Sequence, residues 1–193
     1  MIMEKGHHKL ILFCGPSGSG KSTAVRHVLQ RVPDIAFSVS ATTRPPRINE
    51  IDGKDYYFIS MDDFNDKIDH DEFVEWEEVY SGTRYGTLKS EIQRLWDEGK
   101  NVIFDIDVIG GLKIRQVYPD DSLAILMSPP SVEVLRQRLI DRNTESPESL
   151  ERRVAKAKFE LDHADQFDKV IINDDLESAL REAEMTVRNF ISK

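Results

Sequence analysis

The chain has 193 residues, 32 % of them charged, and a formal net charge of −9 at pH 7. This length fits one α/β domain with small additional lobes. The acidic balance opposes binding to nucleic acid or to an anionic membrane, and no apolar run is long enough for a transmembrane helix. The single cysteine excludes an intrachain disulfide, and with no recognisable targeting segment we expect a cytoplasmic protein. The histidines lack metal-ligand spacing, so we expect no zinc site.

A glycine-rich motif near the start is the first strong signal. It has the pattern G-x-x-x-x-G-K-[ST] and consists of Gly15, Pro16, Ser17, Gly18, Ser19, Gly20, Lys21 and Ser22. An apolar run of strand length precedes it at 10–14, and helical spacing follows to about Val32, as a phosphate-binding P-loop requires. Glycines let backbone N–H groups surround phosphate oxygens, while Lys21 can reach the β- and γ-phosphates and Ser22 can offer a hydroxyl to Mg²⁺. The motif therefore predicts binding of a nucleoside triphosphate.

Two arginines follow the second expected strand, which we assign to residues 35–40. Arg44 and Arg47 flank Pro45 and Pro46, which stiffen the segment and keep it out of a helix interior. A stiff backbone can aim both guanidinium groups at one phosphate, so this segment is a candidate second anion site. A solvated basic loop is the alternative.

The segment 38–98 differs from its flanks because it consists mostly of short strands and turns. We expect a turn at 52–55, strands at 56–59 and 73–80, and helices at 64–69 and 88–98. Ser60 is the expected N-cap of the first of these helices. This organisation indicates a lobe inserted into an α/β core.

The α/β core resumes after the lobe. Apolar runs predict buried strands at 101–107, 122–127 and 170–173, and helices at 112–117 and from Asp174, a cap-like start, to the C-terminus. Asp105 and Asp107 end the first of these strands, at the sheet edge that faces ligands in open α/β folds. We assign the core, a three-layer α/β fold with a parallel sheet, to residues 9–37, 99–129 and 165–193.

Two arginine-bearing helices are predicted within the segment 130–164. Apolar residues recur at helical spacing in both, and Pro147 is expected at the first position of the second helix. The helices carry Arg136, Arg138, Arg142, Arg152 and Arg153. Joined by a short polar turn, they could form a hinged lid over bound phosphates, whereas a charged solvent-facing surface is the alternative for any one arginine.

A P-loop, a second anion-binding segment and an arginine lid together suit the transfer of a phosphoryl group between two nucleotides. Such a reaction depends mainly on positioning and on neutralisation of charge. A phosphate nucleophile is already anionic near neutral pH, so the chemistry needs no dedicated general base, and no Ser–His–Asp arrangement is apparent.

Several longer motifs resemble the guanylate kinase family. In chain order they are 38–47, 53–58, 73–76, 85–87 and 105–107, and the resemblance extends from about Lys9 to the C-terminus. It implies a single domain over 1–193, with a P-loop NTPase core, a GMP-binding lobe at 38–98 and a helical lid at about 130–164. It also implies Mg²⁺-dependent transfer of the ATP γ-phosphate to GMP, giving ADP and GDP, in purine nucleotide metabolism and GMP recycling.

The resemblance further implies roles for individual residues. The residues implied to bind ATP are those of the P-loop, Thr23, Arg138 and Asn173. The residues implied to hold the GMP phosphate are Arg44, Arg47, Tyr56 and Tyr85, and those implied to contact the guanine are Ser40, Glu75, Thr87 and Asp105. Lys21, Arg44, Arg142 and Arg153 would be catalytic, and Ser22 would contact Mg²⁺ bound to the phosphates. ATP and GMP are the expected partners, and the sequence leaves monomer and dimer open.

The chemistry of guanine agrees with the role implied for Glu75. Guanine N1–H and N2–H₂ are adjacent donors that one ionised carboxylate can accept, whereas adenine N1 is an acceptor. Taken alone, the acidic stretch 71–78 would predict a solvated surface. A kinase for another nucleoside monophosphate and a non-catalytic guanylate-kinase-like binding module are the alternatives, and the intact Gly20, Lys21 and Ser22 oppose the module.

Overall fold

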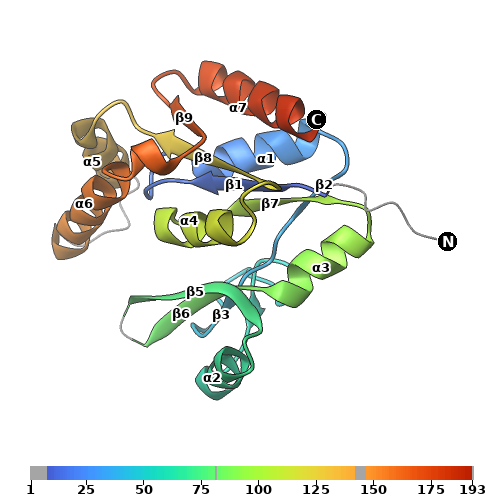
Figure 1. Cartoon of the computed structure of the whole chain (residues 1–193). Coiled ribbons are helices and arrows are strands. Elements are labelled where there is room, and N and C mark those ends of the chain that lie inside the picture. Colours follow the sequence, from blue (N-terminus) through green and yellow to red (C-terminus); the bar gives the residue numbers. More distant parts are fainter. Residues whose placement is uncertain (1–7, 81, 142–146, 193) are drawn as a thin grey trace.

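The computed structural model describes residues 8–80, 82–141 and 147–192, and Figure 1 shows an α/β core, a lobe below it and a helix pair at one side. A five-stranded parallel sheet forms the centre of the core. Its strands, in spatial order, are β2 (Ile35–Phe37), β7 (Asn101–Asp105), β1 (Leu10–Cys14), β8 (Ser122–Ser128) and β9 (Lys169–Ile172). The predicted α/β class with a parallel sheet is confirmed.

Successive side chains of β1 enter different hydrophobic cores because a strand points its residues alternately to opposite faces. Its odd-numbered residues pack with α1 (Lys21–Arg31) and α7 (Leu176–Ile191). Its even-numbered residues pack with α3 (Lys89–Asp97) and α4 (Val108–Val117). The sheet is therefore the middle of three layers (Figure 1), and the C-terminal ends of its strands remain available to ligands.

The lobe contains a mixed four-stranded sheet. Its strands, in spatial order, are β4 (Tyr57–Phe58), β3 (Ala41–Thr42), β6 (Thr83–Leu88) and β5 (Phe73–Tyr80). The helix α2 (Met61–Asp69) covers this sheet with Phe64, whose ring stacks on that of Phe73 at a centroid separation of 4.4 Å. Ser60 accepts a hydrogen bond from the backbone N–H of Asp63 (3.0 Å), so the predicted N-cap of α2 is confirmed.

The strand predicted at 35–40 is shorter than expected. β2 ends at Phe37 and β3 begins at Ala41, because the chain crosses between them from the core sheet to the lobe sheet. Within the crossing, the backbone N–H of Val39 donates to the buried carboxylate of Glu91 on α3 (3.2 Å) instead of to a neighbouring strand. One continuous stretch of the chain thus contributes strands to both sheets.

Three predicted helix starts also change, and the first is that of α2, which begins at Met61 directly after its N-cap instead of at residue 64. The helix expected from residue 112 begins at Val108, because Asp107 ends the preceding extended segment and caps α4 by accepting from Gly110 N–H (2.8 Å). The N-cap of α7 is Asp175 rather than Asp174, since the Asp175 carboxylate accepts from the N–H three residues later, at Ser178 (2.9 Å).

The helix pair consists of α5 (Val132–Asp141) and α6 (Pro147–Leu161). Their apolar residues form a small core of their own, comprising Leu135, Leu139, Leu150, Val154 and Ala157, as the helical spacing predicts. The predicted site residue Arg142 lies outside the described residues. A short 3₁₀ helix (Ala164–Gln166) leads from α6 to β9. Across the described part of the chain, no helix is long and apolar enough to cross a membrane.

Candidate active site

A cavity of about 450 Å³ lies where the core, the lobe and α6 meet. From the core it is lined by the P-loop, the start of α1 and the segment that follows β7. From the lobe it is lined by Ser40, Arg47, Tyr56, Glu75 and Tyr85, and from α6 by Arg153, Lys156 and Glu160. The predicted donor and acceptor sites therefore open into one space at the C-terminal edge of the parallel sheet.

The P-loop runs from the end of β1 to the start of α1. Gly15, Gly18 and Gly20 have φ angles of 140°, 92° and 100°, which residues with a side chain rarely adopt. A Cβ atom on Gly15 would also collide with the carbonyl oxygen of Met127 on β8. The glycines of the motif are thus required by the backbone path that surrounds the phosphate site.

Lys21, Ser22 and Asp105 meet at the P-loop. Lys21 Nζ donates to Gly15 O (2.8 Å) and lies 3.6 Å from Asp105 Oδ1, and Ser22 Oγ donates to Asp105 Oδ2. Asp105 reaches this position because β7 pairs with β1 in parallel register, opposite Phe13. The guanine contact implied for Asp105 stays a prediction, and in the structure its carboxylate contacts the P-loop.

This arrangement fits a magnesium ion bound together with phosphates. A hydroxyl oxygen and a carboxylate oxygen are hard ligands of the kind that Mg²⁺ prefers, and Mg²⁺ is usually bound by one or two carboxylates plus substrate phosphates. Among the described residues no group of three histidine, cysteine or carboxylate side chains could hold a metal ion. A metal beside Ser22 and Asp105 would therefore take further ligands from the nucleotide and water.

Asn173 and Arg138, both predicted to bind ATP, lie behind the P-loop. Asn173 is only 4 % exposed, and its Nδ2 donates to Ser19 O (2.8 Å). The backbone carbonyl oxygen of Asn173 accepts from Arg138 Nη2 (2.7 Å). A Cβ on Gly20 would collide with the Asn173 amide. Neither Asn173 nor Arg138 is among the described residues that line the cavity. Asn173 supports the backbone of the loop directly, and Arg138 supports it through Asn173.

In the predicted phosphate-binding segment of the lobe, Arg44 packs against aromatic side chains. Arg44 stacks over the ring of Tyr56 at 4.9 Å, and its Nε donates to the hydroxyl of Tyr85 (3.1 Å). Arg47, Tyr56 and Tyr85 line the cavity, whereas Arg44 lies behind the two tyrosines and is outside the described lining. Burial raises the pKa of Tyr56, so its hydroxyl stays protonated and can donate a hydrogen bond.

The structure adds Glu50, which sequence reasoning missed. Its carboxylate accepts from Arg44 Nη1 (2.6 Å) and Nη2 (2.7 Å), and from the backbone N–H of Arg47 (2.7 Å). The hydrogen bonds from Arg44 lower the pKa of Glu50 to about 2, and the same pair raises the pKa of Arg44. Its position three residues after Arg47 is a turn-like spacing, which could have suggested the contact.

Glu75 is buried in the lobe, with 8 % of its surface exposed. It faces Thr87 across the β5–β6 pair, and Thr87 Oγ1 donates to Glu75 Oε1 (2.7 Å). Burial raises the pKa of Glu75 to about 7 although the Thr87 hydrogen bond lowers it, and the negative charge of Asp107 raises it further. Asp107, rather than Asp105, is thus the aspartate that shares the Glu75 side of the cavity.

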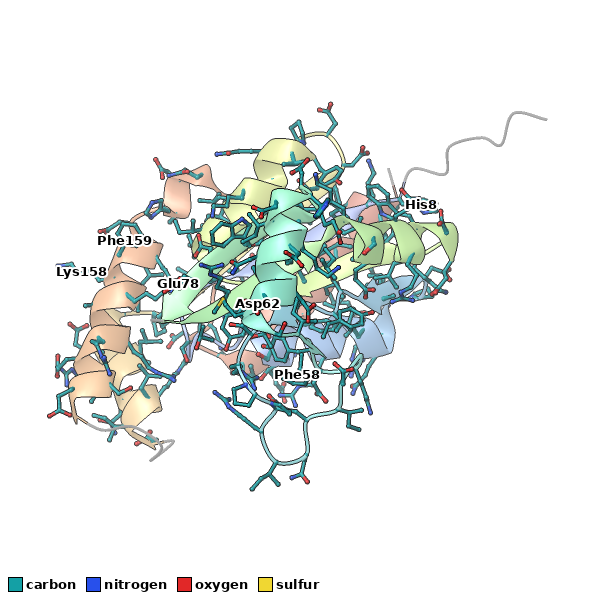
Figure 2. All side chains as sticks on the ribbon, turned by 90° about the horizontal axis from the view of Figure 1, so that it is seen from below. His8, Phe58, Asp62, Glu78, Lys158 and Phe159 are labelled. Carbon is teal, nitrogen blue, oxygen red and sulfur yellow. The ribbon has the colours of Figure 1, made fainter. Side chains whose placement is uncertain are left out.

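The inner face of α6 contacts the core. Arg153 Nη1 donates to Ser17 Oγ (3.1 Å), and Lys156 Nζ donates to Asp107 Oδ2 (3.4 Å). Glu160, 3 % exposed, lies 3.5 Å from Lys156. Figure 2 shows Lys158 and Phe159 on the outer side of the same helix. Sequence reasoning missed Lys156 and Glu160, although their spacing from Arg153 predicts a shared face.

Comparisons with known proteins identify the family of the chain. The model of the guanylate kinase family matches residues 7–190. A guanylate kinase of Bacteroides fragilis is 48 % identical over 97 % of this chain and 92 % of its own length, and one of Porphyromonas gingivalis is 47 % identical over 96 % and 99 %. The crystal structure of a guanylate kinase from Anaplasma phagocytophilum has a TM-score of 0.75 and 30 % identity, covering 96 % of this chain and 87 % of that one. The chain belongs to the guanylate kinase family.

Proposed function

We infer that this chain is an ATP:GMP phosphotransferase that transfers the γ-phosphoryl group of ATP to GMP, giving ADP and GDP. Family membership supports this activity, and one observation of the site carries it. The P-loop lysine Lys21 and the buried carboxylate Glu75 line the same cavity, from the core and from the lobe. A triphosphate on the P-loop and a guanine at Glu75 would therefore direct their phosphates toward each other, as positioning catalysis requires.

For the donor side, we propose that the P-loop and Lys21 bind the ATP phosphates. Lys21 would exchange its contacts with Gly15 O and Asp105 for phosphate oxygens. Ser22 and Asp105 would hold Mg²⁺, which when bound neutralises phosphate charge. This role for Asp105 replaces the guanine contact that the family resemblance implied, because its two carboxylate oxygens lie against Ser22 and Lys21.

For the acceptor side, we propose that the GMP phosphate binds between Arg44, Arg47 and the hydroxyls of Tyr56 and Tyr85. The guanine would lie against Glu75, with its N1–H and N2–H₂ donating to the carboxylate. Thr87 supports this role by holding Glu75 Oε1 at 2.7 Å. Ser40 and Asp107, which line the same cavity, complete the proposed guanine site.

We propose that α5 and α6 act as a lid. Arg153 would move from Ser17 Oγ to the donor phosphates, a short displacement because Ser17 belongs to the P-loop. Arg142 keeps its proposed catalytic role on sequence grounds alone, and Arg138 would act through the P-loop backbone. The division into core, GMP-binding lobe (38–98) and lid (130–164) follows from these roles. The cytoplasm stays the proposed location, on the cysteine content of the sequence.

The two alternative functions receive no specific support. A kinase for adenine or cytosine nucleotides would leave the buried Glu75 carboxylate facing an acceptor atom, and uracil or thymine would offer it one N–H donor instead of two. A non-catalytic binding module would not need the P-loop lysine, the hydroxyl of Ser22 or the carboxylate of Asp105 in contact with one another. Neither alternative explains why the P-loop residues and Glu75 line the same cavity.

Formation of ADP, measured in a coupled assay with GMP, AMP, UMP and dTMP in parallel, tests the proposed function. We expect kcat/KM for GMP to exceed that for AMP by a factor on the order of 10⁴, since buried polar groups reject a base that cannot pair with them. Removal of divalent cations should abolish turnover, and added Mg²⁺ should restore it. Equal turnover of AMP would contradict the guanine assignment, and no turnover with any acceptor would favour a binding module.

A further inference from the structure

Glu50 is a charged residue that the proposed function leaves without a role. It lies in an exposed segment whose neighbour Ile48 is 92 % exposed, yet its own side chain is only 19 % exposed. The carboxylate accepts two charge-assisted hydrogen bonds from the guanidinium of Arg44 and one from the backbone N–H of Arg47. These are the two arginines assigned to the acceptor phosphate. A surface glutamate held by three short contacts is more ordered than a solvated side chain would be.

The contacts of Arg44 show which part of its guanidinium remains available. A guanidinium has five N–H donors on a planar fork. Glu50 binds the edge formed by Nη1 and Nη2, a second Nη1 donor goes to Pro45 O (3.0 Å), and Nε goes to the hydroxyl of Tyr85 (3.1 Å). Among the described residues this leaves one Nη2 donor without a partner. It lies on the Nε–Nη2 edge of the guanidinium, beside the hydroxyl of Tyr85.

We propose that Glu50 is a positioning residue for the acceptor phosphate, a role that rests on the proposed binding of this phosphate by Arg44 and Arg47. By holding the Nη1–Nη2 edge, Glu50 turns the Nε edge of Arg44 toward Tyr85, which lines the cavity. By accepting from the backbone N–H of Arg47, it fixes the segment that carries the second arginine. A guanidinium oriented in advance loses less freedom when the phosphate binds.

The opposite role would be competition, with the Glu50 carboxylate occupying the phosphate site of Arg44. Two contacts favour positioning. Glu50 binds the backbone of Arg47 as well as Arg44, which a phosphate mimic would not need to do. The rings of Tyr56 and Phe58 lie 4.9 Å and 5.6 Å from the Arg44 guanidinium and hold its plane, and Glu50 leaves one Nη2 donor beside Tyr85 unused among the described residues. The two roles predict opposite changes in the affinity for GMP.

The experiment is steady-state kinetics of the Glu50→Gln variant with each nucleotide varied in turn. We expect KM for GMP to rise about tenfold, the loss of one charge-assisted interaction, with KM for ATP changed less than about twofold. Glu72→Gln is the matched control, because it removes the same charge from an exposed ion pair in the same lobe, with Lys67 (2.8 Å). A lower KM for GMP in Glu50→Gln would indicate competition and overturn the proposal, as would an unchanged one.

Two further variants separate the role of Glu50 from the phosphate site itself. If Arg47→Ala leaves KM for GMP unchanged, the proposed phosphate site is wrong, whatever Glu50 does. If Arg47→Ala raises it and Glu50→Gln does not, only the role of Glu50 is wrong. In an Arg44→Ala background, Glu50→Gln should raise KM for GMP much less than it does alone, because residues that act through each other are not additive. Full additivity would overturn the proposal.

Discussion

Lys21 is bound in two directions before any phosphate is present. Its Nζ donates to Gly15 O within the P-loop and faces Asp105 across it. These contacts keep a partly buried cation paired, and they hold the ammonium group at the mouth of the loop, where triphosphate oxygens would replace them. The binding motif is thus preorganised by its own backbone carbonyl and by a carboxylate from a neighbouring strand.

Lys21→Ala should lower kcat by on the order of 10²-fold or more, because it removes a preorganised charge from the transferred phosphoryl group. Turnover of ATP and GMP measures the effect, with circular dichroism to verify folding. Lys100→Ala is the matched control, since Lys100 pairs with Asp34 at 2.9 Å outside the described cavity lining. Turnover of Lys21→Ala close to that of the parent would exclude a donor phosphate on the P-loop.

The guanine contact proposed for Glu75 would make recognition of GMP dependent on pH. Burial raises the pKa of its carboxyl to about 7, so the free enzyme holds it largely protonated below pH 7 and ionised above. A protonated carboxyl presents one donor and cannot accept both guanine donors. Binding of guanine at Glu75 would therefore require loss of the proton, and on this proposal GMP should bind more tightly as pH rises through 7.

We predict that the ratio of KM for GMP in Glu75→Gln to that in the parent enzyme rises from pH 6 to pH 8. Below pH 7 the parent loses up to about tenfold in affinity per pH unit, whereas the glutamine does not titrate. The phosphate of GMP itself titrates near pH 6, but equally for both enzymes, so the ratio removes its effect. Parallel pH profiles of the two enzymes would contradict a guanine contact at Glu75.

The residue that begins helix α4 also lines the cavity. Its N-cap, Asp107, uses one carboxylate oxygen to accept from Gly110 N–H and the other to contact Lys156 of α6. The same residue therefore ends the segment after β7, starts α4 and lines the cavity. Sequence patterns found α4 only from its apolar residues, because the capping role depends on where the chain leaves the sheet.

The N-cap of α7 is a boundary that can be tested without affecting the site. Asp175→Ala should lower Tm by roughly 2–4 °C, because the backbone N–H of Ser178 loses its side-chain acceptor. Asp174→Ala, one residue earlier, is the matched control and should leave Tm within 1 °C, an estimate of roughly that size for exposed sites. Differential scanning calorimetry measures both. Equal losses would mean that the cap is not confined to Asp175.

At the level of the whole molecule, three separately packed parts meet at one cavity. The lobe has its own core around Phe64, and the helix pair has its own core around Leu135. The end of α6 packs Leu161 against the core, whereas nearer the cavity α6 makes polar contacts at Arg153–Ser17 and Lys156–Asp107. Polar contacts at the edge of a cavity can be exchanged for phosphate contacts at low cost, which favours movement of the parts on binding.

Small-angle X-ray scattering should therefore show a smaller radius of gyration when a bisubstrate analogue occupies both nucleotide positions. ATP alone should produce a smaller change, because it engages the P-loop and α6 but not the lobe. The scattering of the nucleotide-free protein is the reference for both. An identical radius of gyration in all three states would indicate rigid parts and remove the lid role proposed for α5 and α6.

The sequence alone determined the features that depend on neighbouring residues. The P-loop is eight consecutive residues, and phosphate binding requires its glycines and its lysine at fixed positions. The periodic spacing of apolar residues located most helices and strands. The long motifs predicted the family, which the comparisons confirm. Local spacing was sufficient in these cases because the interacting atoms belong to one turn, one strand or one helix.

Only the tertiary structure decided which distant side chains meet. Asp105 and Asp107 are two residues apart, and strand periodicity would direct both to one side. In the structure β7 ends at Asp105, which meets Ser22 through the β7–β1 pairing, while Asp107 turns into α4 beside the Glu75 part of the cavity. Pairing of strands and packing of helices depend on contacts between residues far apart in the sequence. The spacing of two aspartates therefore does not predict which side chains each of them contacts.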